Sequence, residues 1–148
     1  MTTQENVMLE AIDELVDEVR LLWHALVRSG ERLHDAEPIT LGMRAVLELL
    51  ASRGPATVPQ IARRRGVTRQ HIQGFVNALL ELKLVSLEPN PEHRRSLLVC
   101  PTPAGAQAIE RMKKRERRFF AGVAFGVSAS EVSRASKTLR SLRNTIGG

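Results

Sequence analysis

Residues 57–81 contain the pattern that most constrains the fold, namely two short helices joined at a glycine. Thr57 and Gln60 form a capping box, which predicts a helix over residues 58–65. Gly66 supplies a tight turn, and Thr68 caps a second helix. This second helix is expected to bury five apolar side chains: Ile72, Phe75, Val76, Leu79 and Leu80. Two short helices with such a connection are typical of a helix-turn-helix.

A β-hairpin is predicted directly after these helices. Apolar residues at positions 84, 85, 87 and 97–99 flank a segment with Pro89, Asn90 and Pro91, and these three residues favour a turn. Arg94 and Arg95 follow the turn on the returning side. A hairpin in this position is the wing of a winged helix. The predicted fold is therefore mainly α with a small β-hairpin wing.

Two helices are expected before these two short helices and the hairpin. The first has a seam of apolar residues at alternating spacings of three and four, uninterrupted before Gly30: Leu9, Ile12, Val16, Val19, Trp23 and Leu26. The second starts at Pro38–Thr40 and stops at Gly54, and it is expected to bury Met43, Val46, Leu47 and Leu50.

Two more helices are expected after the wing. Thr102 and Pro103 start the first of them, whose middle is strongly basic, and a capping box of Ser128 and Glu131 opens the last one. The last helix has an apolar stripe: Val132, Ala135, Leu139, Leu142 and Ile146. Each terminal helix must bury its stripe, either against the other end of the same chain or against a second copy. We favour a homodimer, because twofold dimers are the commonest oligomers.

The expected organisation is one intertwined domain with three parts. Residues 1–37 form an N-terminal dimerisation helix, residues 38–102 the winged helix-turn-helix, and residues 103–148 the C-terminal dimerisation helices. Charge is distributed unevenly over these parts. Residues 1–37 hold nine acidic residues and three arginines, whereas residues 38–148 hold seven acidic residues and 19 lysines and arginines. A basic region after an acidic segment favours a nucleic-acid surface in the later part.

The candidate DNA contacts lie in three groups. Four polar side chains share the exposed face of the second helix of the helix-turn-helix: Arg69, Gln70, Gln73 and Asn77. Arginine reads guanine, and glutamine or asparagine reads adenine, in the major groove. Arg63, Arg64 and Arg65 end the preceding helix and fit phosphate contacts, which fix register without reading sequence. Arg94 and Arg95 suit the narrow minor groove of A·T-rich DNA. Each group also has a simpler reading, as ordinary charge on a solvated surface.

Several classes of function are disfavoured. A single cysteine, Cys100, excludes an internal disulfide. No leader pattern or membrane-length apolar run is present, so a cytoplasmic location and no membrane partner are expected. The four histidines lack the close spacing of a structural zinc site, and we expect no metal and no cofactor. No phosphate-binding loop or nucleophile motif occurs, and an enzyme is not expected.

The segments ITLGMRAVLELL, VPQIARRRGVTRQHIQGFVNALLELKLV and SLEPNPEHRRSLLVCPTPAG, with the terminal helices, resemble the MarR family of bacterial winged-helix transcriptional regulators. The resemblance implies a recognition helix over Thr68–Asn77, a minor-groove contact from Arg94 and a wing-bracing role for Arg95. It places dimerisation on the first, fifth and sixth helices.

Three positions depart from the family pattern. His93 replaces an acid that braces a wing arginine, a role for which Glu92 is the nearest substitute. Gly74 stands where a basic residue is common, which removes a phosphate contact. Lys83 replaces a glycine before the wing strand, which implies strain if that residue needs a positive φ.

The resemblance also implies a small aromatic or phenolic ligand, held between the dimerisation helices and the winged helix. Trp23, His24, Arg28 and Met43 are the candidate lining, with the arginine suited to a carboxylate. Trp23 fits a dimer core better, because it belongs to the apolar seam of the first helix.

Taken together, these features predict a sequence-specific DNA-binding transcriptional regulator, a homodimeric repressor of a palindromic operator that is released by a small ligand. Two alternatives remain open. One is a winged-helix module that docks an acidic protein, and the other is an architectural DNA binder without sequence preference.

Overall fold

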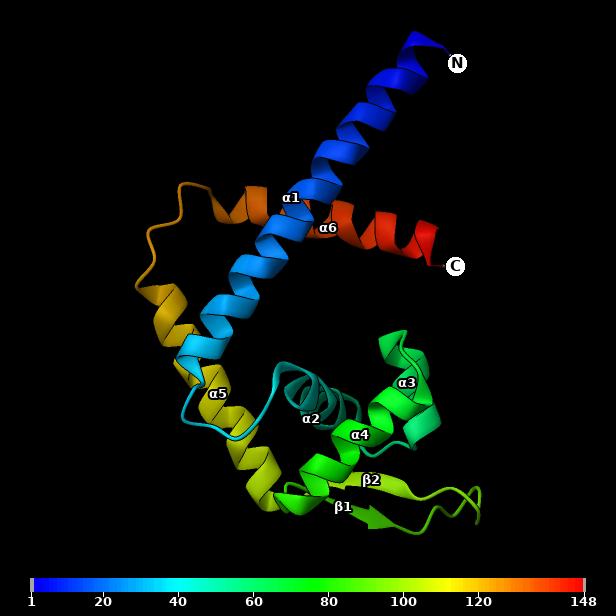
Figure 1. The fold of residues 1–148 in the computed structure, drawn as a ribbon. Helices are drawn as coiled ribbons and strands as arrows, with labels where there is room; N and C mark the ends of the chain where they lie inside the picture. The colour runs from blue at the N-terminus through cyan, green and yellow to red at the C-terminus, as the bar shows by residue number, and fades with distance from the viewer. Residues whose placement is uncertain (1, 148) are drawn as a thin grey trace. The chain divides into compact units, whose positions relative to one another are not determined.

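The computed structural model describes residues 2–147. Within them lie six helices and one two-stranded antiparallel sheet (Figure 1). The helices are α1 (Thr3–Leu33), α2 (Leu41–Arg53), α3 (Val58–Arg65), α4 (Arg69–Glu81), α5 (Pro103–Ala121) and α6 (Ala129–Ile146). The strands are β1 (Val85–Glu88) and β2 (Leu98–Pro101). The chain forms two compact units, one ending at Arg115 and the other starting at Glu116. The predicted mainly α fold with a small hairpin wing is confirmed.

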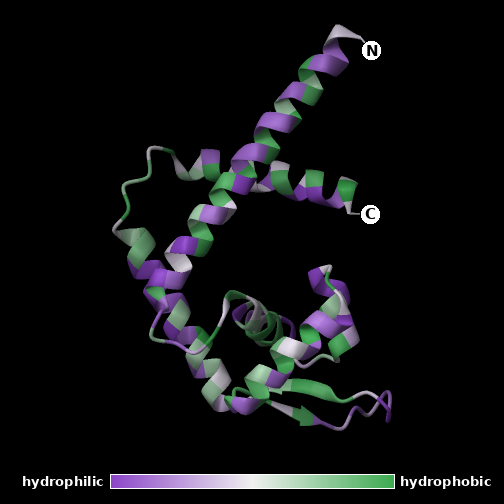
Figure 2. Cartoon of the chain, in the orientation of Figure 1, coloured by the Kyte–Doolittle hydropathy of each residue, from purple (hydrophilic) through white to green (hydrophobic). Residues whose placement is uncertain are grey.

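Helix α1 is long and has no buried residue. It begins with a capping box of Thr2 and Glu5, and it continues through Gly30 to Leu33. A glycine inside a helix weakens it but does not end it. Hydrophobic and hydrophilic residues alternate along this helix (Figure 2). Its apolar side chains are largely exposed, as the 55% exposure of Trp23 illustrates.

The core of the first unit forms around α2. Thr40 caps this helix by accepting a hydrogen bond from the Met43 amide, and Gly54 ends it with a φ of 81°. The buried residues of α2 are the four that the sequence predicts: Met43, Val46, Leu47 and Leu50. They pack in one cluster with apolar side chains of α3, α4, both strands and α5.

The helix-turn-helix has the predicted bounds. The capping box of Thr57 and Gln60 opens α3, and Gly66 ends it in the left-handed region with a φ of 66°. Thr68 then caps α4 by accepting from the His71 amide at 3.2 Å.

The predicted burial of α4 needs a correction at two positions. Ile72, Val76 and Leu79 are buried, but Phe75 and Leu80 are only partly buried. Phe75 packs against the edge of the core, and its ring occupies the space beside Gly42 of α2, with its Cζ 2.1 Å from where a Cβ on that glycine would be.

The wing is anchored to the start of α3. In the antiparallel register, Val85 faces Pro101 and Leu87 faces Val99. On its other side Val99 pairs with Ala56, through an amide-to-carbonyl bond in each direction at 2.9 and 3.3 Å. Ala56 and Val99 are both fully buried. The wing therefore shares its hydrogen bonding with the residues that lead into the helix-turn-helix.

The same hydrogen-bonded motif ends α3 and α4. At α4 the Lys83 amide donates to the Leu80 carbonyl and the Leu84 amide donates to the Leu79 carbonyl, both at 2.9 Å. This Schellman pattern places one residue in the left-handed region, usually a glycine. Lys83 occupies that position with a φ of 57°. The positive φ on which the expected strain at Lys83 depends is therefore present.

Helix α5 starts in contact with the wing. The Thr102 hydroxyl donates to the Lys83 carbonyl at 2.8 Å and accepts from the Gly105 amide at 3.1 Å. A Cβ on Gly105 would lie 2.0 Å from the Leu84 carbonyl oxygen, so this position has room for glycine alone. Farther along, Ala108, Ile109 and Met112 complete the core.

The second unit contains the end of α5 and the whole of α6. The rings of Phe119, Phe120 and Phe125 contact one another at centroid distances of 5.3 and 6.2 Å. The predicted capping box of Ser128 and Glu131 is confirmed, and α6 follows with no buried residue. Apolar and polar residues alternate along α6 as well (Figure 2).

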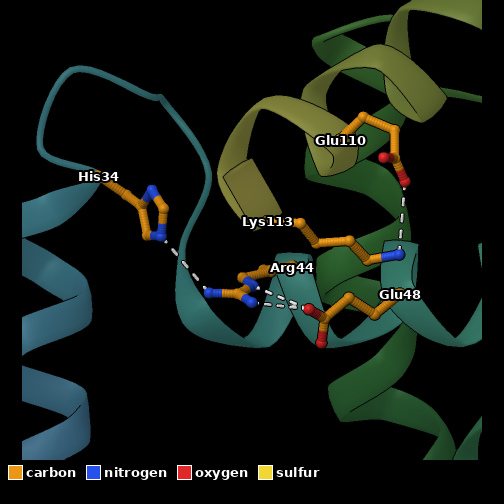
Figure 3. A network of polar contacts seen from close by, with 5 residues as sticks. All are labelled: His34, Arg44, Glu48, Glu110 and Lys113. Carbon is orange, nitrogen blue, oxygen red and sulfur yellow. Dashed lines mark hydrogen bonds and ion pairs between the residues drawn. The ribbon is translucent and has the colours of Figure 1, made fainter. Parts of the chain in front are cut away.

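A polar network joins the end of α1 to α2. His34 caps the C-terminus of α1 and is 6% exposed. Arg44 of α2 lies 3.4 Å from His34 Nε2 through Nη1 and pairs with Glu48 at 2.7 Å (Figure 3). Because arginine can only donate, His34 Nε2 accepts this bond as an unprotonated nitrogen.

Glu37 connects the same region to α5. It accepts a hydrogen bond from Arg111 Nε at 3.4 Å and forms an ion pair with Arg115 at 3.1 Å. Its side chain is 10% exposed, so these pairs are shielded from solvent more than ordinary surface pairs. Lys113 and Glu110 form a longer contact on α5 at 3.5 Å (Figure 3).

Candidate nucleic-acid interface

The exposed face of α4 presents the predicted reading residues. Arg69, Gln70, Gln73 and Asn77 are all exposed, while Ile72, Val76 and Leu79 of the same helix are buried. The core therefore fixes the rotation of α4, and its polar face is left to solvent. Gln73 Nε2 donates to Asn77 Oδ1 at 2.8 Å, so two of these side chains already contact each other.

A hollow of about 580 Å³ lies between α4 and the wing. Arg69, Gln70 and Gln73 line it from α4, and Arg95 lines it from the wing. The remaining lining residues are Thr57, Val58, Pro59, Leu87, Ser96 and Leu97. The structure thus brings one predicted wing residue together with three residues of the predicted recognition helix.

The start of α3 also lines this hollow, which the sequence did not predict. Thr57 was identified only as a helix cap, and no signal in the sequence placed Val58 or Pro59 beside α4. Their position follows from the bridge between Ala56 and Val99, which holds the start of α3 against the wing.

A second, shallower hollow of about 570 Å³ lies between α2 and α4. Thr40 and Met43 line it from α2, and the α4 side is formed by Thr68, Gln70, His71, Gly74, Phe75 and Ala78. A Cβ on Gly74 would meet no atom within 4 Å. A side chain would fit at position 74. Packing therefore does not explain why this chain has a glycine where the family commonly has a basic residue.

The wing tip presents both of its arginines to solvent. Asn90 Oδ1 accepts from the Glu92 amide at 3.0 Å, and the Ser96 amide donates to the His93 carbonyl at 3.0 Å, closing a turn around Arg94 and Arg95. Within residues 2–147 neither arginine forms an ion pair. The substitute brace from Glu92 is therefore not formed in this structure.

The three arginines at the end of α3 are exposed. They lie in the last turn, where cations interact favourably with the negative end of the helix dipole. Their contact with phosphates stays a prediction.

The predicted ligand-lining residues differ in their surroundings. Trp23, His24 and Arg28 are exposed on α1, whereas Met43 is 5% exposed and belongs to the core. Met43 lines the hollow between α2 and α4. The structure does not bring the four residues together within one unoccupied space that it describes, and the crevice stays a prediction.

Two titratable residues have environments that disfavour charge. Burial raises the pKa of the Cys100 thiol, and the nearby Glu88 carboxylate adds to this effect, so the reactive thiolate is disfavoured. Burial also lowers the pKa of His34, and the positive charges of Arg44 and Arg115 lower it further against the opposite effect of Glu37.

In the part of the chain that the structure describes, no three acidic, histidine or cysteine side chains gather as metal ligands. None of the described helices has the length and hydropathy needed to cross a membrane.

The fold and the polar face of α4 define a winged-helix DNA-binding protein. The MarR family model matches residues 44–96, which run from α2 to the wing turn. The uncharacterized protein Rv2011c of Mycobacterium tuberculosis is 38% identical over 108 residues, covering 73% of this chain and 75% of that protein.

Solved structures of MarR family proteins resemble this chain over most of its length. The crystal structure of a MarR family transcription regulator is 28% identical, with a TM-score of 0.78 and coverage of 95% of each chain. Bordetella bronchiseptica BpsR, whose DNA binding is regulated by 6-hydroxynicotinic acid, shares the fold at 20% identity and a TM-score of 0.74, covering 85% of this chain and 90% of BpsR.

This chain belongs to the MarR family of transcription regulators. It is a DNA-binding regulator and not an enzyme, which confirms the prediction from the sequence.

Proposed function

We propose that the protein is a homodimeric, cytoplasmic repressor that binds a palindromic operator and is released by a small aromatic or phenolic ligand. The observation that carries the proposal is the hollow between α4 and the wing, where Arg69, Gln70 and Gln73 lie beside Arg95. Side chains that form paired hydrogen bonds with bases are thus gathered next to a wing arginine.

The terminal helices support the proposed dimer. Neither α1 nor α6 has a buried residue, although each carries an apolar stripe. In a twofold dimer the two copies of α4 would meet successive major grooves, which requires half-sites about ten base pairs apart. Arg63, Arg64 and Arg65 would bind phosphates beside each half-site.

Release by a ligand is supported by BpsR, whose DNA binding responds to an aromatic acid. A ligand changes DNA affinity only when it binds one arrangement of the dimer better than another. Arg28 on α1 offers a positive charge for the carboxylate of such a ligand.

The first test is the selection of bound fragments from the source genome at about 150 mM salt, where non-specific binding is weak. A recovered palindrome with half-sites about ten base pairs apart would support the proposal. Fragments without a common sequence would indicate an architectural DNA binder. Retention of no DNA would indicate a module that docks an acidic protein.

The wing contact is tested with Arg94→Ala. The substitution is expected to weaken operator binding about tenfold, chiefly where the flanks are A·T-rich, because the narrow minor groove attracts arginine. Titration of labelled operators with A·T-rich and G·C-rich flanks measures the effect. Arg20→Ala is the matched control, since Arg20 is an exposed arginine on α1 that pairs with Asp17. Equal affinities for Arg94→Ala and the control would remove Arg94 from the DNA contact.

A further inference from the structure

The contact between Gln73 and Asn77 makes the reading face of α4 asymmetric. Gln73 Nε2 donates to Asn77 Oδ1 at 2.8 Å, one helical turn away. Among the described residues, the side chains of Arg69 and Gln70 make no hydrogen bond. The orientation of the Gln73 amide is thus restrained before DNA is bound, while its two neighbours are not.

A restrained amide presents a defined group to a base. One side of the Gln73 amide is its NH₂ group, which is held toward Asn77, and the other side is the carbonyl oxygen Oε1. The bond to Asn77 therefore leaves Oε1 as the acceptor that faces away from Asn77. Gln73 also lines the hollow beside the wing.

The major-groove edges of the four bases differ in the group that would meet this oxygen. Adenine offers its N6 amino group and cytosine its N4 amino group, and both donate. Guanine and thymine present O6 and O4 there, and these oxygens only accept. An acceptor in a fixed position discriminates between the two pairs of bases.

We propose that Asn77 is a positioning residue that holds the Gln73 amide with Oε1 toward the DNA, so that Gln73 selects adenine or cytosine over guanine or thymine. This inference rests on the proposed function, because it takes α4 as the helix that reads bases. Asn77 acts through Gln73 and needs no base contact of its own.

The test begins with selection of operators from a randomised library by the wild-type protein. The position read by Gln73 is the one whose base preference is lost in Gln73→Ala. Affinities are then measured for operators carrying each of the four bases at that position. The wild-type protein is expected to prefer adenine or cytosine.

The measured quantity is the ratio of the affinity for operators with adenine or cytosine at this position to the affinity for operators with guanine or thymine. Asn77→Ala is expected to reduce this ratio about twofold, since glutamine–asparagine pairs one turn apart contribute modestly to side-chain order. In the Gln73→Ala background the same substitution should leave the four affinities in unchanged proportion. Glu81→Ala, which changes an exposed residue at the far end of α4 and outside the reading face, is the control and should leave the ratio at this position intact.

Asn77→Asp separates positioning from direct contact. Aspartate only accepts hydrogen bonds, so it should still accept the bond from Gln73 Nε2 and preserve the ratio. Its negative charge should weaken binding to all operators alike. A preference for guanine or thymine, an unchanged ratio in Asn77→Ala, or a lost ratio in Asn77→Asp would overturn the inference while leaving a DNA-binding regulator in place. Failure of the wild-type protein to enrich any sequence would overturn the proposed function itself, and the inference with it.

Discussion

Two residues in the same backbone motif show how a side chain determines the steric cost of a positive φ. Gly66 ends α3 and Lys83 follows α4, and both have positive φ angles, of 66° and 57°. At Gly66 this conformation has no steric penalty, whereas at Lys83 the Cβ crowds the backbone. The protein therefore holds strain at the start of the wing.

Replacing Lys83 with glycine is expected to raise the free energy of unfolding by about 1 kcal/mol. Relief of the left-handed conformation contributes about 1–2 kcal/mol, and the greater freedom of glycine in the unfolded chain offsets part of it. Chemical denaturation measures the change. Gly66→Lys, the reverse substitution in the same motif, should lower stability, and a loss of stability in Lys83→Gly would show that Lys83 makes a compensating contact.

His34 makes stability depend on pH. Its pKa in the folded protein lies below the ordinary value of 6.5, chiefly because of burial and then because of Arg44 and Arg115. The unfolded chain therefore binds the proton first as the pH falls, and stability is lost on acidification. The loss begins as the pH passes through about 6.5 and ends below the folded pKa.

We expect His34→Gln to flatten this dependence. Thermal unfolding of the wild-type protein between about pH 7.5 and 5.5 should show a falling midpoint, and the variant should show a smaller fall. His24→Gln, which replaces an exposed histidine on the same helix, is the control. Parallel curves for the wild-type protein and His34→Gln would assign the acid sensitivity to other groups.

At the scale of elements, the helix caps allowed the starts of two helices to be predicted from the sequence. The paired residues Thr57–Gln60 and Ser128–Glu131 fixed the starts of α3 and α6, because a capping box is local and needs no tertiary contact. The buried set of α2 was likewise predicted in full. The partial burial of Phe75 was not predicted, since the packing of its ring depends on the space beside Gly42 in another helix.

The candidate site was predictable only in part for the same reason. The spacing of the apolar residues along α4 determines which face is polar, and so Arg69, Gln70 and Gln73 could be identified from the sequence. The position of Val58, Pro59 and Arg95 around the same hollow depends on the strand pairing of Ala56 with Val99, which no local pattern indicates.

The junction of α5 with the wing depends on one glycine. Gly105→Ala is expected to destabilise the protein by about 1–3 kcal/mol, because its Cβ would overlap the Leu84 carbonyl and force the helix away from the strand. Gly74→Ala is the matched control in a helix with open space at its Cβ, and it should raise stability by about 0.5–1 kcal/mol. Denaturant titrations of the two variants compare them, and equal stabilities would contradict the close approach.

At the scale of the whole molecule, the question is what covers the terminal helices. Trp23 in the apolar seam of α1 is 55% exposed and Val132 in the stripe of α6 is 52% exposed, values typical of surface and not of core residues. Large apolar side chains exposed in contiguous stripes mark interaction surfaces. A second copy of the chain is the partner we propose.

Leu139→Glu tests this assignment. Leu139 lies within the apolar stripe of α6, and an acid there would be buried without a partner in a dimer but solvated in a monomer. Sedimentation should show twice the chain mass for the wild-type protein and a shift toward the single chain for the variant. Lys137→Glu, on the opposite side of α6, should remain dimeric. An unchanged mass for Leu139→Glu would place the dimer contact elsewhere.

The hydrogen bond between Gln73 and Asn77 also bears on how such regulators diverge. Exposed positions outside the core tolerate substitution within about 0.5 kcal/mol, so the reading face of α4 can drift with little effect on folding. Positions 73 and 77 are the exception, because a change at one alters what the other presents. New operator preferences should therefore arise at this pair by coupled substitutions, while Arg69 and Gln70 can change one at a time.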